Sequence, residues 1–249
     1  MELHKFKQIN ATYLLMSICI TTFLLEIFYN YAFGKAAFDN LFYTFGFSMQ
    51  NILAGKIWTF VTSLFLHANA EHLILNMIAL FFFGSVVEHE IGWKKTILIF
   101  FSSAFLGEIA VLMASYVGIM PATIPVIGAS GAVFGLLGAA MLIKPLEFVV
   151  FPYLIPIPLL LVALIYIFFN ITEFIVVLAS GGVTDVAYVA HIGGLAAGIL
   201  WGFKQEGRKR SLIVLIAILA ILIVIPFVWD FLRYLEITNY TSLLSKVFK

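Results

Sequence analysis

The sequence predicts an all-α membrane protein, a polytopic bundle of transmembrane helices. Of its 249 residues, 63% are hydrophobic and only 11% are charged, whereas soluble domains average about 45–50% apolar and about 25% charged residues. The chain also divides into apolar runs of about the 20 residues that a helix needs to cross the hydrocarbon core. The formal net charge of +1, without a basic stripe, excludes a nucleic-acid-binding protein.

Seven apolar runs define the predicted helices. They lie at residues 11–33, 70–90, 96–117, 127–144, 153–179, 187–204 and 211–233. The first run is long enough to span and ends in no small-residue cleavage site, so we interpret it as a retained helix. The segment 34–69 mixes aromatic and polar residues with glycines, which favours a half-submerged position at the interface. The fifth run begins with Pro152, Pro156 and Pro158, so we expect irregular first turns.

The chain reads as one membrane domain over residues 1–249, with a core at 11–204 and an extra helix at 211–233. Nine of the 14 Lys and Arg residues fall on one side of the predicted helices, most densely at 204–210. The positive-inside rule then places the N-terminus in the cytoplasm and, with seven spans, the C-terminus outside. The predicted location is the plasma membrane.

The single cysteine, Cys19, excludes disulfides and thiolate metal sites.

Polar residues stand near the start of three apolar runs. His72 and Asn76 open the second run, Ser130 the fourth and His191 the sixth. All three runs enter from the predicted outer side, so the four residues lie at a similar shallow depth. Polar groups inside a membrane segment are costly and mark functional sites. We therefore expect them to form a single site.

Serine and histidine together are the minimum set for acyl transfer. A serine hydroxyl becomes a nucleophile when a neighbouring base takes its proton, and His191 is the only histidine in the C-terminal half of the chain. The reaction also needs donors for the oxyanion. His72 and Asn76, four residues apart on one helix face, and free backbone N–H groups at the start of the fourth helix are candidates. Asp185 lies upstream of His191 in a loop, so we expect a Ser–His dyad without a third member.

A packing pattern explains how Ser130 and His191 would meet. Glycines at helical spacing line one face of each helix: Gly131 and Gly135 on the fourth, Gly194 and Gly198 on the sixth. Small residues four apart let two membrane helices approach closely, which predicts hydrogen-bond contact between Ser130 and His191. Phe134 lies one turn below Ser130 on the same face, where it would pack on the imidazole ring.

Three motifs carry a resemblance to a known family. They are Gly128-x-Ser130-Gly131, Ala190-His191 followed by Gly194-x-x-x-Gly198, and His67-x-x-x-x-His72-x-x-x-Asn76. In this order, over residues 11–204, the chain resembles the rhomboid family of intramembrane serine proteases.

The resemblance implies a role for each matching residue. Ser130 would be the nucleophile and His191 the general base, while His72, Asn76 and the Ser130 amide would form the oxyanion hole. His67 is interpreted as a loop-anchoring residue. The resemblance also implies a hydrated cavity, a capping loop at about 180–187 and a lateral gate formed by the fifth helix. The expected partners are transmembrane protein substrates and the lipid bilayer, with no cofactor and no metal.

Some positions agree with the family pattern and others depart from it. Phe134 stands where the family has an aromatic residue, usually tyrosine, and Glu88 matches a glutamate at the far end of the second helix. Many members carry Trp-Arg in the first loop, whereas here Trp58 is followed by Thr59. The seventh run, 211–233, resembles the "6+1" layout of part of the family.

Two other functions are weighed against the protease. A small transporter would show inverted repeats, and no second copy of the glycine-serine motif occurs. An inactive rhomboid-like protein would lack the serine or the histidine. The zinc motif His-Glu-x-x-His and the aspartyl motif Gly-x-Gly-Asp are absent.

Three carboxylates inside apolar runs could mark a proton path, but we favour a structural role for them: Glu26, Glu108 and Glu173.

Overall fold

The computed structural model describes residues 10–150, 156–180, 188–207, 209–217, 219–220, 224 and 227. Four helical segments in this part are long and apolar enough to cross a membrane: α1 (Ala11–Phe33), Ala70–Ile91, α7 (Trp93–Tyr116) and Leu159–Val176 within α9. The second segment comprises α5 (Ala70–Ala79), a π-helical turn η2 (Leu80–Gly84) and α6 (Ser85–Ile91). The protein is therefore an integral, multi-pass membrane protein, and the predicted helical fold class is confirmed.

The chain divides into two compact units, residues 1–206 and 207–249. The first contains every helix and strand that carries a label here. In the second, residues 209–217, 219–220, 224 and 227 are helical. Much of the predicted seventh helix at 211–233 lies outside the described residues, so the "6+1" layout stays a prediction.

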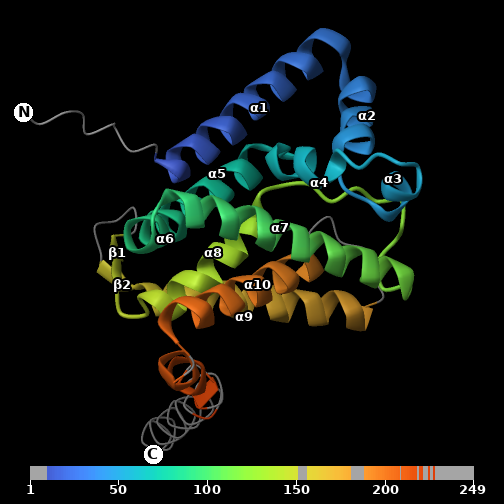
Figure 1. Ribbon diagram of the computed structural model, residues 1–249. Coiled ribbons are helices and arrows are strands. Elements are labelled where there is room, and N and C mark those ends of the chain that lie inside the picture. Colours follow the sequence, from blue (N-terminus) through green and yellow to red (C-terminus); the bar gives the residue numbers. More distant parts are fainter. Residues whose placement is uncertain are drawn as a thin grey trace, which may run out of the picture. The chain divides into compact units, whose positions relative to one another are not determined.

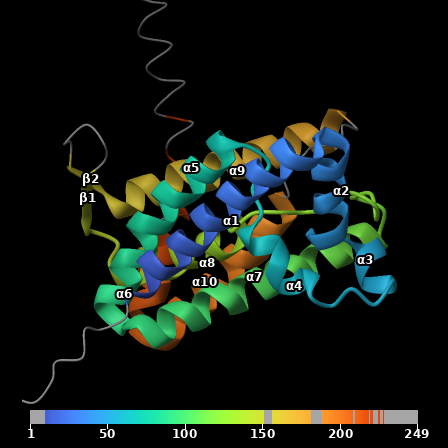
Figure 2. The same ribbon diagram turned by 90° about the horizontal axis from the view of Figure 1, so that it is seen from above.

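Helix α8 (Ser130–Ile143) forms the centre of the first unit. Every residue from Gly131 to Ile143 is buried, as expected for a helix that is apolar on all sides. It packs most extensively against α10 (Tyr188–Glu206) and α7. In Figures 1 and 2, α8 and α10 run side by side, with α9 (Leu159–Ser180) along α10.

The segment between α1 and α5, which the structure describes in full, contains no helix long and apolar enough to cross a membrane. It folds into four short helices: α2 (Lys35–Phe45), α3 (Met49–Leu53), α4 (Thr59–Thr62) and the 3₁₀ turn η1 (Ser63–Phe65). The Asn51 side chain ties this segment together, since its amide donates to the Tyr43 and Gly46 carbonyls at 2.9 and 2.8 Å. An antiparallel bridge from Phe47 to Val126 joins it to the strand-like chain before α8.

The prolines before α9 give the fifth apolar run the irregular start that the sequence predicts. Phe148–Val150 (β1) pairs with Pro156–Pro158 (β2) in a small antiparallel sheet, and α9 begins only at Leu159. Within the described residues, the predicted run at 153–179 is helical from Leu159 onward. Proline lacks the N–H that an interior helical position must donate, and residues 151–155 lie outside the described part.

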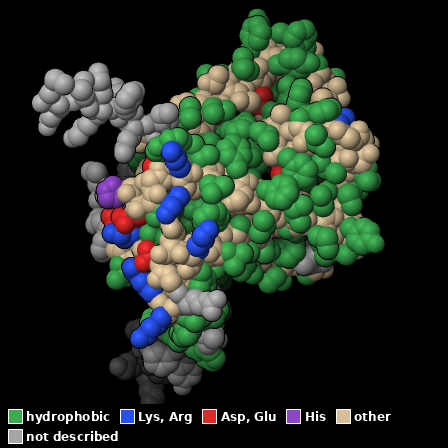
Figure 3. All heavy atoms as spheres, viewed as in Figure 1, with side chains coloured by type: hydrophobic (Ala, Val, Ile, Leu, Met, Phe, Trp, Pro, Cys, Tyr) green, Lys and Arg blue, Asp and Glu red, His purple; other side chains and the backbone are tan. Residues whose placement is uncertain are grey.

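Charged side chains gather at the end of the bundle opposite the starts of α5, α8 and α10. Figure 3 shows hydrophobic side chains over most of the visible face. At the charged end, Lys144 after α8 pairs with Glu90 of α6 at 3.1 Å. Lys94 and Lys204, at the start of α7 and the end of α10, lie over tryptophan rings.

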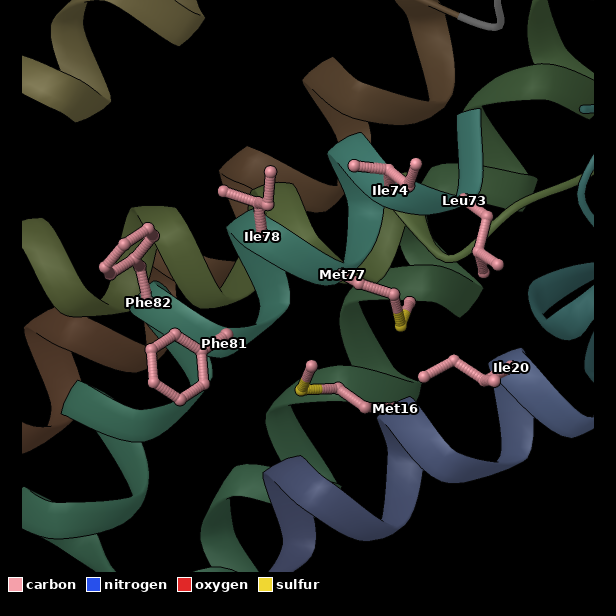
Figure 4. Close-up of a pocket in the computed structure, with 8 residues that line it drawn as sticks. All are labelled: Met16, Ile20, Leu73, Ile74, Met77, Ile78, Phe81 and Phe82. Carbon is pink, nitrogen blue, oxygen red and sulfur yellow. The ribbon is translucent and has the colours of Figure 1, made fainter. Parts of the chain in front are cut away.

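One apolar pocket of about 500 Å³ lies between α1 and the α5–η2 segment. Met16 and Ile20 of α1 face Leu73, Met77 and their apolar neighbours on α5 and η2 (Figure 4). The side chains that line it are hydrophobic, and neither Ser130 nor His191 is among them. The pocket therefore offers no group for chemistry.

The N-terminus of α1 is held by Glu88 of α6. The Glu88 carboxylate accepts hydrogen bonds from the backbone N–H groups of Ala11 and Thr12, at 2.7 and 2.9 Å, and from the Thr12 hydroxyl at 2.7 Å. A helix N-terminus has unpaired N–H groups and a partial positive charge. A carboxylate there accepts hydrogen bonds from the N–H groups and is attracted by the charge. The glutamate that the family resemblance singled out thus acts as an N-terminal cap between two helices.

We expect Glu88→Ala to destabilise the protein by roughly 1.5–3 kcal/mol, the range for hydrogen bonds to a charged group. The change leaves the N–H groups at the start of α1 without this acceptor. Thermal unfolding in detergent, followed by tryptophan fluorescence, measures the effect. Glu173→Ala is the matched control, because Glu173 is exposed on α9. Equal unfolding midpoints for the two variants would contradict the assigned role of Glu88.

Candidate active site

Ser130 and His191 meet at one end of the α8–α10 pair. Ser130 is the first residue of α8, and His191 lies in the first turn of α10. His191 Nε2 is 2.7 Å from Ser130 Oγ, a hydrogen-bond distance. His191 is only 7% exposed. Residues 61 positions apart in sequence are thus brought together inside an apolar bundle.

Close contact between the backbones of the two helices creates this distance. A Cβ added at Gly194 would overlap the Gly131 carbonyl, and one at Gly198 would overlap the Gly135 carbonyl. Only hydrogen side chains allow this approach. The predicted contact between the two glycine-lined faces is therefore present.

The ring of Phe134 lies flat against the imidazole of His191. The ring centroids are 4.4 Å apart and the planes differ by 7°. Tyr188, three residues before His191, meets the imidazole edge-on at 6.2 Å. Stacking on one face and an edge contact restrict the plane of the imidazole ring.

Asn170 contacts His191 on the side opposite Ser130. Its side-chain amide, from α9, lies 2.6 Å from His191 Nδ1. The sequence prediction of a dyad without a third group overlooked this contact. The signal in the sequence was an asparagine within the apolar stretch that begins at Leu159. A polar side chain at membrane depth needs a partner, and in the structure Asn170 is buried.

His72 and Asn76 line the loop that precedes Ser130. Gly128 has a φ of +109°, and a Cβ there would lie 2.7 Å from the His72 ring and 3.8 Å from Asn76 Nδ2. The Gly128 N–H donates to the Ser63 carbonyl at 2.8 Å, which fixes the loop to η1. The structure thus brings His72 and Asn76 of α5 next to the start of α8, while their role as oxyanion donors stays a prediction.

His67 anchors the chain just before α5. Its backbone N–H faces the Glu26 carboxylate of α1 at 3.3–3.4 Å, and its ring Nδ1 lies 3.1 Å from the Phe65 carbonyl. The ring is fully buried and meets His72 edge-on at 5.1 Å. Burial, with a smaller contribution from His72, lowers the pKa of His67 to about 4. His67 is therefore neutral at pH 7.

The three carboxylates within apolar runs have different surroundings. Glu26 and Glu108 are buried, and Glu108 accepts a hydrogen bond from the Ser63 hydroxyl at 2.9 Å. Both bind the segment before α5, which fits a structural role. Glu173 is exposed on α9, so the expectation that it is a structural hub inside the bundle was wrong. Helix α9 has a buried face and an exposed face. Its apolar content alone does not reveal on which face Glu173 lies.

Two expectations fall outside the described residues. One is the capping loop predicted at about 180–187, of which residues 181–187 are not described, and the other is Asp185 in the same loop. Within the described part, no group of three or more His, Cys, Asp or Glu side chains could hold a metal ion.

Substituting Gly198 tests the helix contact. We expect Gly198→Val to push α10 away from α8, because the new side chain would occupy the space of the Gly135 carbonyl. The bond between His191 and Ser130, two turns away, should then lengthen, and both the unfolding midpoint and the reactivity of Ser130 should fall. Ala196→Val is the control, since Ala196 is exposed on the same helix. Unchanged stability in Gly198→Val would refute the close contact.

The depressed pKa of His67 predicts a pH-dependent stability. An unfolded His67 would titrate near its ordinary value of 6.5 and the folded one near 4, so between these values the unfolded state binds more protons. Its contribution to stability therefore falls as the pH drops through this window. We expect His67→Leu to reduce the slope of the unfolding midpoint between pH 6.5 and 4.5. Ala68→Leu, at the adjacent exposed position, removes no titratable group and should leave the slope unchanged; a similar effect in both variants would argue against the assignment.

A family model and several known proteins match this sequence. The family model of the Rhomboid domain matches residues 54–208, more than half of the chain. RHOMBOID-like protein 12, mitochondrial, of Arabidopsis thaliana is 28% identical over 67% of this chain and 52% of its own length. Rhomboid protease GluP of Bacillus subtilis is 29% identical over 83% of this chain and 38% of its own. RHOMBOID-like protein 1 of Arabidopsis thaliana is 32% identical over 59% of this chain and 34% of its own.

The matches thus cover about half or less of the length of these relatives. The range matched by the family model, 54–208, includes both Ser130 and His191. Because the family model matches more than half of it, the chain belongs to the rhomboid family.

Proposed function

We propose that this protein is a serine endopeptidase that cleaves transmembrane segments of other membrane proteins. The observation that carries the proposal is the 2.7 Å contact between His191 Nε2 and Ser130 Oγ. A serine hydroxyl buried in a membrane bundle is usually a packing group. One hydrogen-bonded to the ring of an oriented histidine has the geometry of an activated nucleophile.

The reaction follows from this pair of side chains. As Ser130 Oγ attacks the carbonyl carbon of the scissile peptide bond, His191 Nε2 takes the hydroxyl proton. His191 then gives this proton to the leaving amine, which frees the first product and leaves an acyl group on Ser130. A water molecule, deprotonated by the same nitrogen, hydrolyses the ester and restores the serine.

The developing oxyanion needs donors beside Ser130. Asn76 supplies an amide N–H and His72 an imidazole N–H, and both lie against the Gly128 loop. The N-terminus of α8 adds backbone N–H groups that have no partner inside the helix, together with its partial positive charge. These groups would stabilise the tetrahedral intermediate more than the planar substrate.

The burial of the site sets conditions on its substrate. A helical backbone hides its carbonyls in hydrogen bonds, so a transmembrane substrate must unwind near the cut. Non-helical backbone is tolerated at membrane depth only beside protein or a water-filled cavity. The site therefore requires access to water, and we place its opening on the outer side of the membrane, with the N-terminus in the cytoplasm.

The membrane that holds the protein belongs to the same proposal. We favour the plasma membrane, although two of the relatives carry the word mitochondrial in their names. A seventh helix at 211–233 would complete the "6+1" layout.

An inactive rhomboid-like protein and a small transporter are the alternatives. An inactive relative would keep the fold and lose the nucleophile or the base, whereas here both are present in hydrogen-bond contact. Bacillus subtilis GluP, similar over 83% of this chain, is named as a rhomboid protease. The protease is therefore the function best supported.

Labelling with a fluorophosphonate probe tests the proposal directly. We expect the detergent-solubilised wild type to be labelled, Ser130→Ala to be unlabelled, and His191→Ala to react at least about 10³-fold more slowly because the serine has lost its base. Ser17→Ala, an exposed serine on α1, should label like the wild type. A folded wild type that resists the probe, or label that persists in Ser130→Ala, would rule out the proposed nucleophile.

A further inference from the structure

The inward face of α9 ends in a single amide. Leu159, Ala163, Ile167 and Asn170 recur at intervals of four, four and three residues, which places them on one helix face. All four are buried, and Asn170 is 7% exposed. Phe169, the next residue toward the N-terminus, is 61% exposed. The Asn170 side chain therefore points into the bundle, where it reaches His191.

His191 is held at both ring nitrogens. Nε2 faces Ser130 Oγ at 2.7 Å, and Nδ1 lies 2.6 Å from the side-chain nitrogen Nδ2 of Asn170. A neutral imidazole carries one proton, so one nitrogen donates and the other accepts. The group that faces Nδ1 thus decides which state Nε2 presents to the serine.

The amide of Asn170 permits two networks. Its nitrogen donates and its oxygen accepts, and a half-turn of the amide group exchanges the two at the same place. If the nitrogen faces Nδ1, as the amide is drawn in this structure, the ring proton sits on Nε2 and His191 donates to Ser130, which leaves no base. If the oxygen faces Nδ1, that nitrogen carries the proton and the Nε2 lone pair accepts from the serine hydroxyl.

We propose that Asn170 is a positioning residue whose amide oxygen accepts a hydrogen bond from His191 Nδ1–H. This bond keeps Nε2 unprotonated toward Ser130, and it persists when His191 takes the serine proton and becomes an imidazolium. Phe134 restricts the plane of the ring, and Asn170 restricts its rotation within that plane. The catalytic consequence rests on the proposed function, whereas the hydrogen bond itself does not.

The membrane explains why an amide suits this position. A carboxylate would orient the histidine equally well, but an ionised group buried among apolar helices carries a large desolvation cost. A neutral amide oxygen accepts the same hydrogen bond at a smaller cost of burial. Because Asn170 belongs to α9, the state of His191 also depends on how that helix packs.

Nitrogen NMR of protein labelled with ¹⁵N-histidine reads the proton directly. The chain has five histidines, and His191→Gln identifies the signals of His191. We expect the wild type at neutral pH to show a protonated Nδ1 and an unprotonated Nε2. The reverse assignment would overturn the proposal. The measurement needs no turnover, so a protein with the expected tautomer but no reactivity toward the probe would contradict the proposed function and leave this inference intact.

Three variants test the consequence of the hydrogen bond. Asn170→Leu keeps the size of the side chain and removes the acceptor, so we expect the Nδ1–H preference to be lost and Ser130 to react roughly 10–100-fold more slowly, the factor of one charge-assisted hydrogen bond. Asn170→Asp restores an acceptor and should recover both the tautomer and most of the rate. Phe169→Leu, at the adjacent exposed position, should match the wild type.

Each result of this series bears on the proposal. Wild-type rate and tautomer in Asn170→Leu would overturn it, as would equal losses in Asn170→Leu and Asn170→Asp. If the leucine variant fails to fold, the tautomer of the wild type still decides between the two networks.

Discussion

The site depends on the contact of two helix backbones. Gly194 and Gly198 of α10 lie directly against the carbonyls of Gly131 and Gly135 on α8. Lipid tails are as apolar as the side chains they would replace, so membrane helices gain little from hydrophobic burial and associate through close packing instead. This packing fixes the separation of α8 and α10, and with it the distance between groups at their ends.

Polar contacts hold the remaining elements around this pair. Glu88 caps α1, Glu26 faces the His67 backbone, and Glu108 accepts from Ser63. Each joins segments that are far apart in the sequence, in an environment where an unpaired polar group is expensive. The Ser63 carbonyl also receives the Gly128 N–H, so the loop before Ser130 is positioned by the same set of bonds. The carboxylates thus join the surrounding scaffold to the site.

Much of this arrangement follows from the sequence. Apolar runs near spanning length identified the helices, and glycines at spacings of three and four predicted the α8–α10 contact. Other features could not be predicted from the sequence, for physical reasons. The small sheet before α9 pairs residues through backbone bonds that leave no periodic pattern, and Glu173 faces outward on a helix whose apolar content hides its buried face. Asn170 was missed because it belongs to none of the three motifs and to neither glycine-lined face.

The sequence by itself determined that this is a helical membrane protein and which polar side chains its helices carry, because the length and periodicity of apolar runs are local properties. The tertiary structure decided which of those side chains touch. The 2.7 and 2.6 Å contacts on either side of His191 depend on the rotation and separation of α8, α9 and α10. The rotation and separation of these helices are set by the packing of backbone and side-chain surfaces against one another. They therefore cannot be predicted from the sequence of any single helix.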